Sequence, residues 1–506
     1  MNQLVNAIWA QYLKLHRYKI NRFSEQPHES QEEELMSILD TAKYTEWGQK
    51  YHFADVLTAN DWRQRLPVQD YESIKSDIFR MMKGEFDVLW PGRVSYFSKS
   101  SGTTNDKSKY IPVTEENHKD CHVRGGWRQL ALMYENIPDP RIIEGKSIIM
   151  AGSSTNNLSE FPGSTIGDVS AIVLQRIPYV GKLHLSPDLD IALMADFETK
   201  LEKIAEICIH EDIRMMAGVP TWAMVVFDKI LEKTGKSNIL EVWPRMQIFI
   251  HGAVSFGPYR EPFKQYFPSD EFYYQETYNA SEGYFAVQSD FASDDMLLLL
   301  DNGVYYEFIP MEEWESEFPN TLLLSEVEIG KNYAIVITTN SGLYRYKIGD
   351  TVTFTSLAPY KIKITGRTKQ FINVFGEEVM VANTDAALIK TCEMYDAKMK
   401  EYTVAPIFLN ANGKGGHEWI IEFEKLPSDV NLFAATLDEN LRKINSDYDA
   451  KRYHDLALVS LKLNVAPEGT FMKWMKSKNK IGAQQKVPRL SNQRTNLEEI
   501  LQLINN

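Results

Sequence analysis

Residues 98–109 read Ser-Lys-Ser-Ser-Gly-Thr-Thr-Asn-Asp-Lys-Ser-Lys, and the interpretation of the whole chain depends on this stretch. The preceding run, 94–97, reads as a short strand, and Thr114 is a suitable N-cap for the helix that follows. Exposed backbone N–H groups in such a turn form a concavity that binds anions. A flexible surface loop has the same composition, so a phosphate site is indicated only together with other nucleotide motifs. The candidate phosphate ligands are Ser98, Ser100, Ser101, Gly102, Thr103, Thr104, Lys107 and Lys109.

Two other segments resemble the end of a Walker phosphate loop but lack its first glycine. For Gly145-Lys146-Ser147 that position is Pro140, and for Gly235-Lys236-Ser237 it is Ile230. The sequence also lacks the glycine fingerprint of dinucleotide-binding folds. Kinase-like and Rossmann-type interpretations therefore lose their main support.

Length and composition set the broad class of the protein. A chain of 506 residues is too long for one ordinary hydrophobic core, so two or more domains are expected. Hydrophobic residues make up 43% and charged residues 25%, as in folded soluble proteins. The net charge of −14 and the lack of a sustained basic run argue against a nucleic-acid partner. Cys121, Cys208 and Cys392 are odd in number and far apart, which does not suggest a disulfide framework.

The first twenty residues have the pattern of a helix, with Leu4, Ile8, Tyr12 and Leu15 along one face. They lack the hydrophobic region of a signal peptide and the length of a transmembrane span. We therefore expect a cytoplasmic protein without a membrane partner.

Three residues on the helix after 114 imitate a metal site. His118, Cys121 and His122 would share one helix face, but no fourth ligand or supporting partner is visible in the sequence. We interpret them as exposed helix residues.

Strand-like and helix-like segments alternate in the middle of the chain. Runs at 146–151 and 246–250 read as strands, and those at 197–210 and 220–233 read as helices, which indicates an α/β core. From 296 to 354, short β-runs are separated by turn residues, as in an antiparallel sheet or a small barrel.

The composition changes again near residue 367, after which helices alternate with strands. We therefore expect an α/β protein with a large N-terminal domain over 1–366 and a small α+β C-terminal domain over 367–506. The large domain should contain mixed β-sheets flanked by helices, together with a β-barrel-like section.

Two segments at strand ends carry groups suited to a nucleotide. Residues 248–253 run from a strand into the tight turn His251-Gly252-Ala253, where backbone can approach a flat ring closely, although a plain strand end has the same pattern. In 275–283, Tyr278 offers an aromatic ring, Ser281 a hydroxyl for a phosphate, and Glu282 a carboxylate suited to Mg²⁺. The second segment is similar to a serine-hydrolase elbow, but Asn279 stands where the first glycine should be.

Four further residues complete the set of candidates. Asp350 follows a glycine turn after a strand-like run, where a carboxylate can accept both ribose hydroxyls, and Arg367 supplies a guanidinium 17 residues later. Lys486 and Arg489 have a Lys-x-x-Arg spacing near the C-terminus. Taken alone, Asp350 has the pattern of an ordinary turn aspartate, and Lys486 with Arg489 has the pattern of a solvated basic tail.

Taken in order, these motifs resemble those of the adenylate-forming superfamily of acyl-CoA synthetases, luciferases and peptide-synthetase adenylation domains. Within it, the sequence looks most like the Gretchen Hagen (auxin-responsive) family of acyl-acid amido synthetases. The likeness rests on Ser100-Ser101-Gly102-Thr103, on 278–282 and on 344–350, and it extends from about residue 60 to the C-terminus.

The resemblance implies a ligase that works in two steps with ATP and Mg²⁺. A carboxylic acid and ATP would form an acyl-adenylate and pyrophosphate, and the amine of an amino acid would then attack the acyl carbon and release AMP. By position, Ser281 would contact the α-phosphate, Glu282 Mg²⁺ and Asp350 the ribose, and Lys486 would be the catalytic lysine, with Lys480 as the alternative. The other carried-over nucleotide contacts are Ser100, Ser101, Gly102, Thr103, Thr104, His251, Gly252, Ala253, Tyr278 and Arg367. The superfamily also implies a C-terminal domain that rotates about a hinge near 367–370.

Two other functions stay open: an acyl-CoA ligase of the same superfamily and a non-catalytic nucleotide- or acyl-binding protein. The lack of an obvious basic patch for the CoA 3′-phosphate disfavours the first, and the presence of Glu282, Asp350 and Lys486 together disfavours the second. Arg124 and Arg128 fall where the family lines its acyl pocket, and we interpret them as helix-surface charges rather than partners of a substrate carboxylate. A monomer or weak homodimer is expected.

Overall fold

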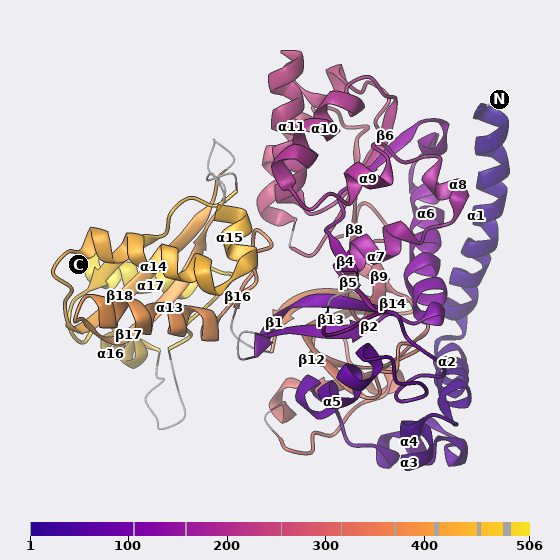
Figure 1. The fold of residues 1–506 in the computed structure, drawn as a ribbon, viewed down its shortest axis with the longest axis horizontal. Helices are drawn as coiled ribbons and strands as arrows, with labels where there is room; N and C mark the ends of the chain where they lie inside the picture. The colour runs from indigo at the N-terminus through magenta and orange to yellow at the C-terminus, as the bar shows by residue number, and fades with distance from the viewer. Residues whose placement is uncertain are drawn as a thin grey trace.

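The computed structural model describes residues 2–104, 107–156, 159–254, 256–314, 316–368, 371–408, 414–452, 457–478 and 487–505. Figure 1 shows a larger N-terminal part, coloured indigo to light orange, beside a smaller C-terminal part coloured orange to yellow. This arrangement agrees with the predicted α/β fold of a large N-terminal and a small C-terminal domain. The exact boundary at 366/367 stays a prediction.

A layer of helices forms the N-terminal end of the chain and supports the larger part. It comprises α1 (Asn2–Glu25), α2 (Pro27–Ala42), α3 (Glu46–Lys50), α4 (Ala59–Arg65) and α5 (Tyr71–Met82). Among the described residues, no helix has the length and apolar character needed to cross a bilayer.

The face of α1 that we singled out from the sequence packs only in part, through the Tyr12 ring, which meets the Trp127 ring edge-on at 5.4 Å. Ile8 and Leu15 are 61% and 64% exposed, whereas Leu13, Ile20 and Phe23 are buried. The helix contacts the rest of the protein through this second stripe and through Trp9, whose ring stacks on Trp127 at 5.1 Å. Both stripes have helical spacing, so only the tertiary partner decides which one is buried.

A large mixed sheet forms the centre of the N-terminal part. Its strand order in the described residues is β11-β12-β13-β14-β10-β9-β8-β7-β6-β3. Strands β3, β6, β7 and β8 run parallel, and the rest pair antiparallel. For 296–354, where the sequence allowed a sheet or a small barrel, the strands continue this sheet. The strands are β3 (Lys146–Ile149), β6 (Ile213–Ala217), β7 (Ile248–Gly252), β8 (Tyr273–Ala280), β9 (Gly283–Val287), β10 (Met296–Leu298), β11 (Val304–Pro310), β12 (Asn332–Thr339), β13 (Tyr346–Leu357) and β14 (Tyr360–Arg367).

Helices flank the large sheet, as the alternating pattern predicted. They are η2 (Asn117–Val123), α6 (Arg124–Asn136), α7 (Val169–Gln175), α8 (Tyr179–Lys182), α9 (Leu189–Ala192), α10 (Phe197–Cys208), α11 (Pro220–Thr234) and α12 (Arg260–Tyr266). Short 3₁₀ turns lie at η1 (Phe53–Asp55), η3 (Ile142–Glu144), η4 (Ile239–Glu241), η5 (Gly257–Tyr259), η6 (Met311–Glu313) and η7 (Leu324–Glu326).

A second, smaller sheet carries the hydroxyl-rich stretch. Its strands are β1 (Tyr96–Thr104), β2 (Lys107–Pro112), β4 (Ser154–Asn156) and β5 (Thr165–Gly167), and they lie in the order β2-β1-β5-β4. Strand β1 pairs antiparallel with β2. Thr114 then caps the next helix as predicted, because its Oγ1 accepts a hydrogen bond from the Asn117 N–H at 2.9 Å.

The C-terminal part has the predicted α+β composition. It contains β15 (Phe371–Ile372), β16 (Val379–Met380), α13 (Val381–Met394), β17 (Lys398–Ile407), β18 (Gly416–Lys425), α14 (Val430–Ile444), α15 (Ser446–Arg452), β19 (Lys462–Ala466), α16 (Thr470–Ser477) and α17 (Thr495–Asn505). β17, β18 and β19 form one sheet. Its core is continuous with that of the parallel strands, where Phe249 and Phe375 belong to one apolar cluster.

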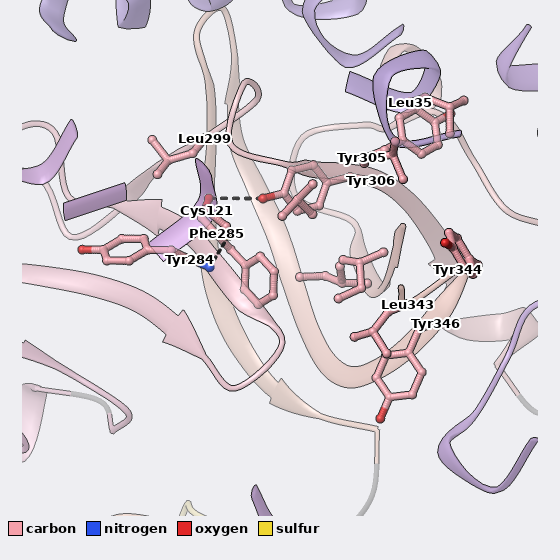
Figure 2. Close-up of a cluster of buried hydrophobic side chains, with 14 of the residues drawn as sticks. Leu35, Cys121, Tyr284, Phe285, Leu299, Tyr305, Tyr306, Leu343, Tyr344 and Tyr346 are labelled. Atoms are coloured by element: carbon pink, nitrogen blue, oxygen red, sulfur yellow. Dashed lines mark hydrogen bonds between the residues drawn. The ribbon is translucent and has the colours of Figure 1, made fainter. Parts of the chain in front are cut away.

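The expected exposure of His118, Cys121 and His122 is wrong, since all three are buried. Figure 2 shows the surroundings of Cys121: the Tyr284 N–H donates a hydrogen bond to its Sγ at 3.2 Å, inside a core of tyrosine, leucine and phenylalanine side chains. Burial lowers the pKa of His122 to about 4, so the ring is neutral at pH 7. Within the part of the chain that the structure describes, no cluster of three or more His, Cys, Asp or Glu residues could hold a metal.

Arg128 is also not the surface charge that we expected. Its side chain is 3% exposed and Nη2 forms an ion pair with Asp301 at 2.6 Å. Arg124 is only partly exposed and donates to the Asp301 carbonyl at 2.9 Å. Both arginines therefore join α6 to the turn before β11. The three cysteines are free thiols, as their spacing predicted.

A buried ion pair between Arg345 and Glu307 gives a first testable prediction. Arg345 Nε and Nη2 donate to the Glu307 carboxylate at 3.0 and 2.9 Å, and both side chains are at most 5% exposed. We expect Arg345→Met to lower the free energy of unfolding by about 3–5 kcal/mol, because it leaves the Glu307 charge buried and unpaired. Urea unfolding followed by tryptophan fluorescence measures this change. The double variant with Glu307→Leu should recover much of the loss, and a double variant less stable than Arg345→Met would contradict the account.

Candidate active site

A cleft of about 1550 Å³ lies where strands of both N-terminal sheets meet the C-terminal part. It brings together seven of the nucleotide candidates, although they are spread from Lys109 to Arg367 in the sequence. The predicted site residues that line it are Tyr278, Ser281, Glu282, Asp350, Arg367, Ala253 and Lys109. From the C-terminal part, the lining includes Phe371, Asn373, Gly376, Glu378, Asp447, Lys451 and Asn492.

Strand pairing explains why Asp350 and Arg367 meet. They lie on β13 and β14, which form an antiparallel hairpin, and the two residues are direct partners in its register. Arg367 Nε donates to Asp350 Oδ1 at 2.8 Å. The separation of 17 residues in the sequence is therefore the length of one hairpin.

Tyr278 reaches the same carboxylate from β8. Its hydroxyl donates to Asp350 Oδ2 at 2.6 Å, and both side chains are buried. Each carboxylate oxygen has a second acceptor position, so Asp350 can hold Tyr278 and Arg367 and still accept two further hydroxyl groups. This fits a group that binds both hydroxyls of a ribose.

Glu282 follows the end of β8 and is 7% exposed. Burial raises the pKa of its carboxyl to about 7, with a smaller upward contribution from Asp350, while the Lys109 ammonium opposes the shift. A cation bound here would restore the ionised form. A single buried carboxylate that shares a cation with phosphate oxygens is the usual protein contribution to a magnesium–nucleotide site. The donor set at Glu282 therefore fits Mg²⁺ bound with ATP.

The hydroxyl-rich stretch touches the Glu282 segment directly. Ser98 Oγ donates to Ser281 Oγ at 2.9 Å, and Ser98 is fully buried. The backbone of 100–104 continues β1, but the side chains of these residues, and of Lys107, are outside the described set. The roles of Ser100, Ser101, Gly102, Thr103 and Thr104 stay predictions.

Lys99 and Lys109 are the described lysines of this stretch that line the cleft, and Lys109 is the one whose charge acts on Glu282. Its Nζ donates to the Tyr346 hydroxyl at 3.5 Å, and its charge acts on Glu282. Lys480 and Lys486 both lie outside the described residues, so the choice between them rests on the sequence alone.

Of the predicted contacts His251, Gly252 and Ala253, only Ala253 lines the cleft. A Cβ on Gly252 would lie 2.6 Å from the Thr277 carbonyl oxygen, so only glycine allows this approach of β7 to β8. Ala253 has a positive φ of 70° and lines the cleft. The His251 ring stacks on Phe256 at 4.0 Å, and burial lowers its pKa to about 3.

Sequence reasoning missed the C-terminal wall of the cleft. Lys451 Nζ lies 3.7 Å from the centroid of the Trp222 ring, and Asn373 Nδ2 donates to the Ala253 carbonyl at 3.3 Å. These residues have no motif around them and are more than 100 positions from their partners. Only the folded chain shows the contacts.

Comparison with protein-family models gives a consistent match along the chain. The GH3 family N-terminal domain matches residues 16–197 and 167–272, the GH3 family central domain 297–367, and the GH3 family C-terminal domain 382–495. Together these cover most of the sequence, and the cleft-lining Tyr278, Ser281 and Glu282 lie between two matched ranges, at 273–296.

Two similar proteins have names that describe synthetases acting on a small acid. Indole-3-acetic acid-amido synthetase GH3.4 of Arabidopsis thaliana is 22% identical, over 93% of this chain and 90% of the relative. Jasmonoyl--L-amino acid synthetase JAR4 of Nicotiana attenuata is 21% identical, over 64% of this chain and 66% of the relative.

Two solved structures share the fold. AtGH3.15 acyl acid amido synthetase in complex with 2,4-DB aligns with a TM-score of 0.63 and 18% identity, over 98% of this chain and 97% of that one. 2-Hydroxyisobutyryl-CoA ligase in its thioesterification state aligns with a TM-score of 0.56 and 12% identity, over 94% and 92% of the two chains. With the family models covering residues 16–272, 297–367 and 382–495, this protein belongs to the GH3 family.

Proposed function

We propose that this chain is an ATP-dependent acyl-acid amido synthetase, a carbon–nitrogen-forming ligase that joins a small carboxylic acid to an amino acid. The observation that carries the proposal is the convergence of Tyr278, Glu282, Asp350 and Arg367 in one cleft of a GH3-family chain. The relatives' names, an indole-3-acetic acid-amido synthetase and a jasmonoyl-L-amino acid synthetase, support the same reaction class. We further propose that it acts in the cytoplasm, as a monomer or weak homodimer.

In the first half-reaction the described residues would bind and orient ATP. The Asp350 carboxylate, fixed by Tyr278 and Arg367, would accept the ribose hydroxyls, and Ser281 would contact the α-phosphate. Glu282 would hold Mg²⁺, which neutralises phosphate charge when it is bound. Lys109 would add a fixed positive charge beside it. Holding the acid carboxylate in line with the α-phosphate supplies most of the remaining catalysis.

Lys486 is the lysine that we expect to stabilise negative charge during adenylation. Lys486→Ala should lower acid-dependent AMP formation by about 100- to 1000-fold, whereas Lys480→Ala should change it less than about threefold. The exchange of labelled pyrophosphate into ATP measures this step. If Lys480→Ala has the larger effect, the assignment of the two lysines is reversed.

The proposed function is tested with ATP, Mg²⁺ and a mixed pool of aromatic and aliphatic acids, together with amino acids or with CoA. Mass spectrometry of the products should detect AMP and a new amide only in the mixture with amino acids. A CoA thioester instead of an amide would establish an acyl-CoA ligase. ATP binding without AMP in any mixture would favour a non-catalytic nucleotide-binding protein and would overturn the proposal.

A further inference from the structure

A second group of charged residues, apart from those we assign to the nucleotide, lines the cleft. Asp447 and Lys451 lie four residues apart on α15, so they share one face of this C-terminal helix. Lys451 is only 4% exposed, and its Nζ lies 3.7 Å from the centroid of the Trp222 ring on α11. Residues from both parts of the protein thus form this end of the cleft.

The backbone beside Lys451 carries no side chain, because the residue there is Gly376. Gly376 has a positive φ of 83°, and a Cβ there would come within 3.3 Å of Lys451 Nζ and 3.7 Å of Val219 Cγ1. Glycine at 376 therefore leaves the space that the ammonium group occupies. Val219 and Trp222 border this space, and Met150 adds to the apolar lining of the same cleft.

The charged groups that act on Asp447 come from both the N-terminal and the C-terminal part of the protein. Burial and then Glu378 raise the pKa of its carboxyl to about 6, with a further upward contribution from Asp168. Lys451 on its own helix and Lys99 on β1 oppose that shift. Burial lowers the pKa of the Lys451 ammonium to about 7, although Asp447 and Glu377 act against it. Both groups can therefore exchange protons near neutral pH.

A zwitterion needs this combination of groups. The α-carboxylate of an amino acid requires a cation, its ammonium must lose a proton before it can attack, and its side chain requires a surface of its own. We propose that Asp447, Lys451 and Trp222 form the subsite for the acceptor amino acid, with Lys451 holding the α-carboxylate and Asp447 accepting the ammonium proton. Met150, Val219 and Trp222 favour an acceptor with an apolar side chain.

This inference rests on the proposed function and completes its second half-reaction. The acceptor's ammonium gives one proton to the Asp447 carboxylate, and the neutral amine attacks the acyl carbon of the adenylate. The new C–N bond forms as the bond from the acyl carbon to the phosphate oxygen breaks. AMP leaves with that electron pair, and the second N–H proton passes to solvent.

The test compares Lys451→Met with Lys473→Met, a matched control at an exposed lysine on α16. Conjugation is measured with an apolar amino acid and with the corresponding amine that lacks the carboxylate. For Lys451→Met we expect the KM of the amino acid to rise about 10- to 100-fold and that of the amine to stay the same, because a charge-assisted contact to the carboxylate is lost. Lys473→Met should match the wild type with both substrates.

Acid-dependent exchange of pyrophosphate into ATP separates this inference from the proposed function, because exchange needs no acceptor. If Lys451→Met keeps its preference for the amino acid over the amine, the subsite assignment is wrong. If exchange and conjugation fall together, Lys451 only holds the two parts of the protein in place. Should the wild type show no exchange, the proposed function fails, and saturation-transfer NMR of the amino acid with wild type and Lys451→Met still decides whether the subsite exists.

Asp447→Asn provides an independent readout. We expect it to lower kcat for conjugation about 100-fold near pH 7, with recovery as pH rises and more of the acceptor amine is already neutral. An unchanged pH profile would contradict the role of Asp447 as proton acceptor.

Discussion

Replacing Glu282 by glutamine is expected to lower acid-dependent AMP formation by about 100- to 1000-fold, the effect of removing a group that stabilises charge in the transition state. Glutamine keeps the shape of the side chain but cannot supply the negative charge that holds Mg²⁺ beside the phosphates. Pyrophosphate exchange at several Mg²⁺ concentrations measures the change. Full exchange at ordinary Mg²⁺ concentrations would show that Glu282 is not the magnesium ligand.

The same substitution should make the ligand-free protein more stable at high pH. In the folded state the pKa of Glu282 is raised to about 7, from an ordinary value of 4.5, by burial. For a raised pKa, the associated stability is present below the unfolded value and is lost as pH rises through the folded one. Near pH 8 the buried charge should destabilise the wild type by up to about 3 kcal/mol. Glu282→Gln removes that penalty, so its Tm should exceed the wild-type Tm at about pH 8 and match it near pH 4.

Glu34 offers a matched control for this prediction. Burial also raises its pKa to about 7, and it accepts a hydrogen bond from the Gly303 N–H at 2.9 Å, outside the residues that line the cleft. Glu34→Gln should therefore show a similar pH-dependent gain in Tm with unchanged AMP formation. A loss of activity in Glu34→Gln would mean that the effect of Glu282→Gln does not report on magnesium binding.

Asp350→Asn is expected to raise the KM for ATP by about 100-fold. In the wild type both carboxylate oxygens accept bonds, from the Tyr278 hydroxyl at 2.6 Å and from Arg367 Nε at 2.8 Å. An asparagine presents an NH₂ group to one of these donors, which breaks that hydrogen bond and weakens the acceptor position for the ribose. Each lost bond to a charged group is worth about 1.5–3 kcal/mol. Steady-state kinetics with ATP as the varied substrate measures the effect.

Asp295 is the matched control for Asp350. It is 9% exposed. Its carboxylate accepts a hydrogen bond from Thr355 Oγ1 on β13 at 2.8 Å and pairs with Lys361 on β14 at 3.1 Å. Asp295→Asn should reduce Tm without changing the KM for ATP. Equal effects of the two substitutions on that KM would show that Asp350 acts through fold stability rather than through the ribose.

The positions in the cleft of four candidate residues, Ser281, Glu282, Asp350 and Arg367, could be predicted from the sequence, because their motifs sit at strand ends and turns. Ser281 and Glu282 follow β8, and Asp350 and Arg367 face each other across one hairpin, so local strand and turn signals place them. The sequence could not place Lys451 against Trp222, since that contact depends on how the two parts of the chain pack. For the same reason it misjudged the buried Cys121 and Arg128, whose burial is decided by distant partners.

The fate of the carboxylate oxygen tests most directly whether the acid is activated as an adenylate. The protein is incubated with ATP, Mg²⁺, amino acids and a pool of carboxylic acids whose carboxyl oxygens are labelled with ¹⁸O, and the nucleotide products are analysed by mass spectrometry. If the acid attacks the α-phosphate, AMP must carry one ¹⁸O atom, and the amide must keep the other. Label in inorganic phosphate with ADP as the nucleotide product, or AMP without label, would contradict the adenylate-forming mechanism.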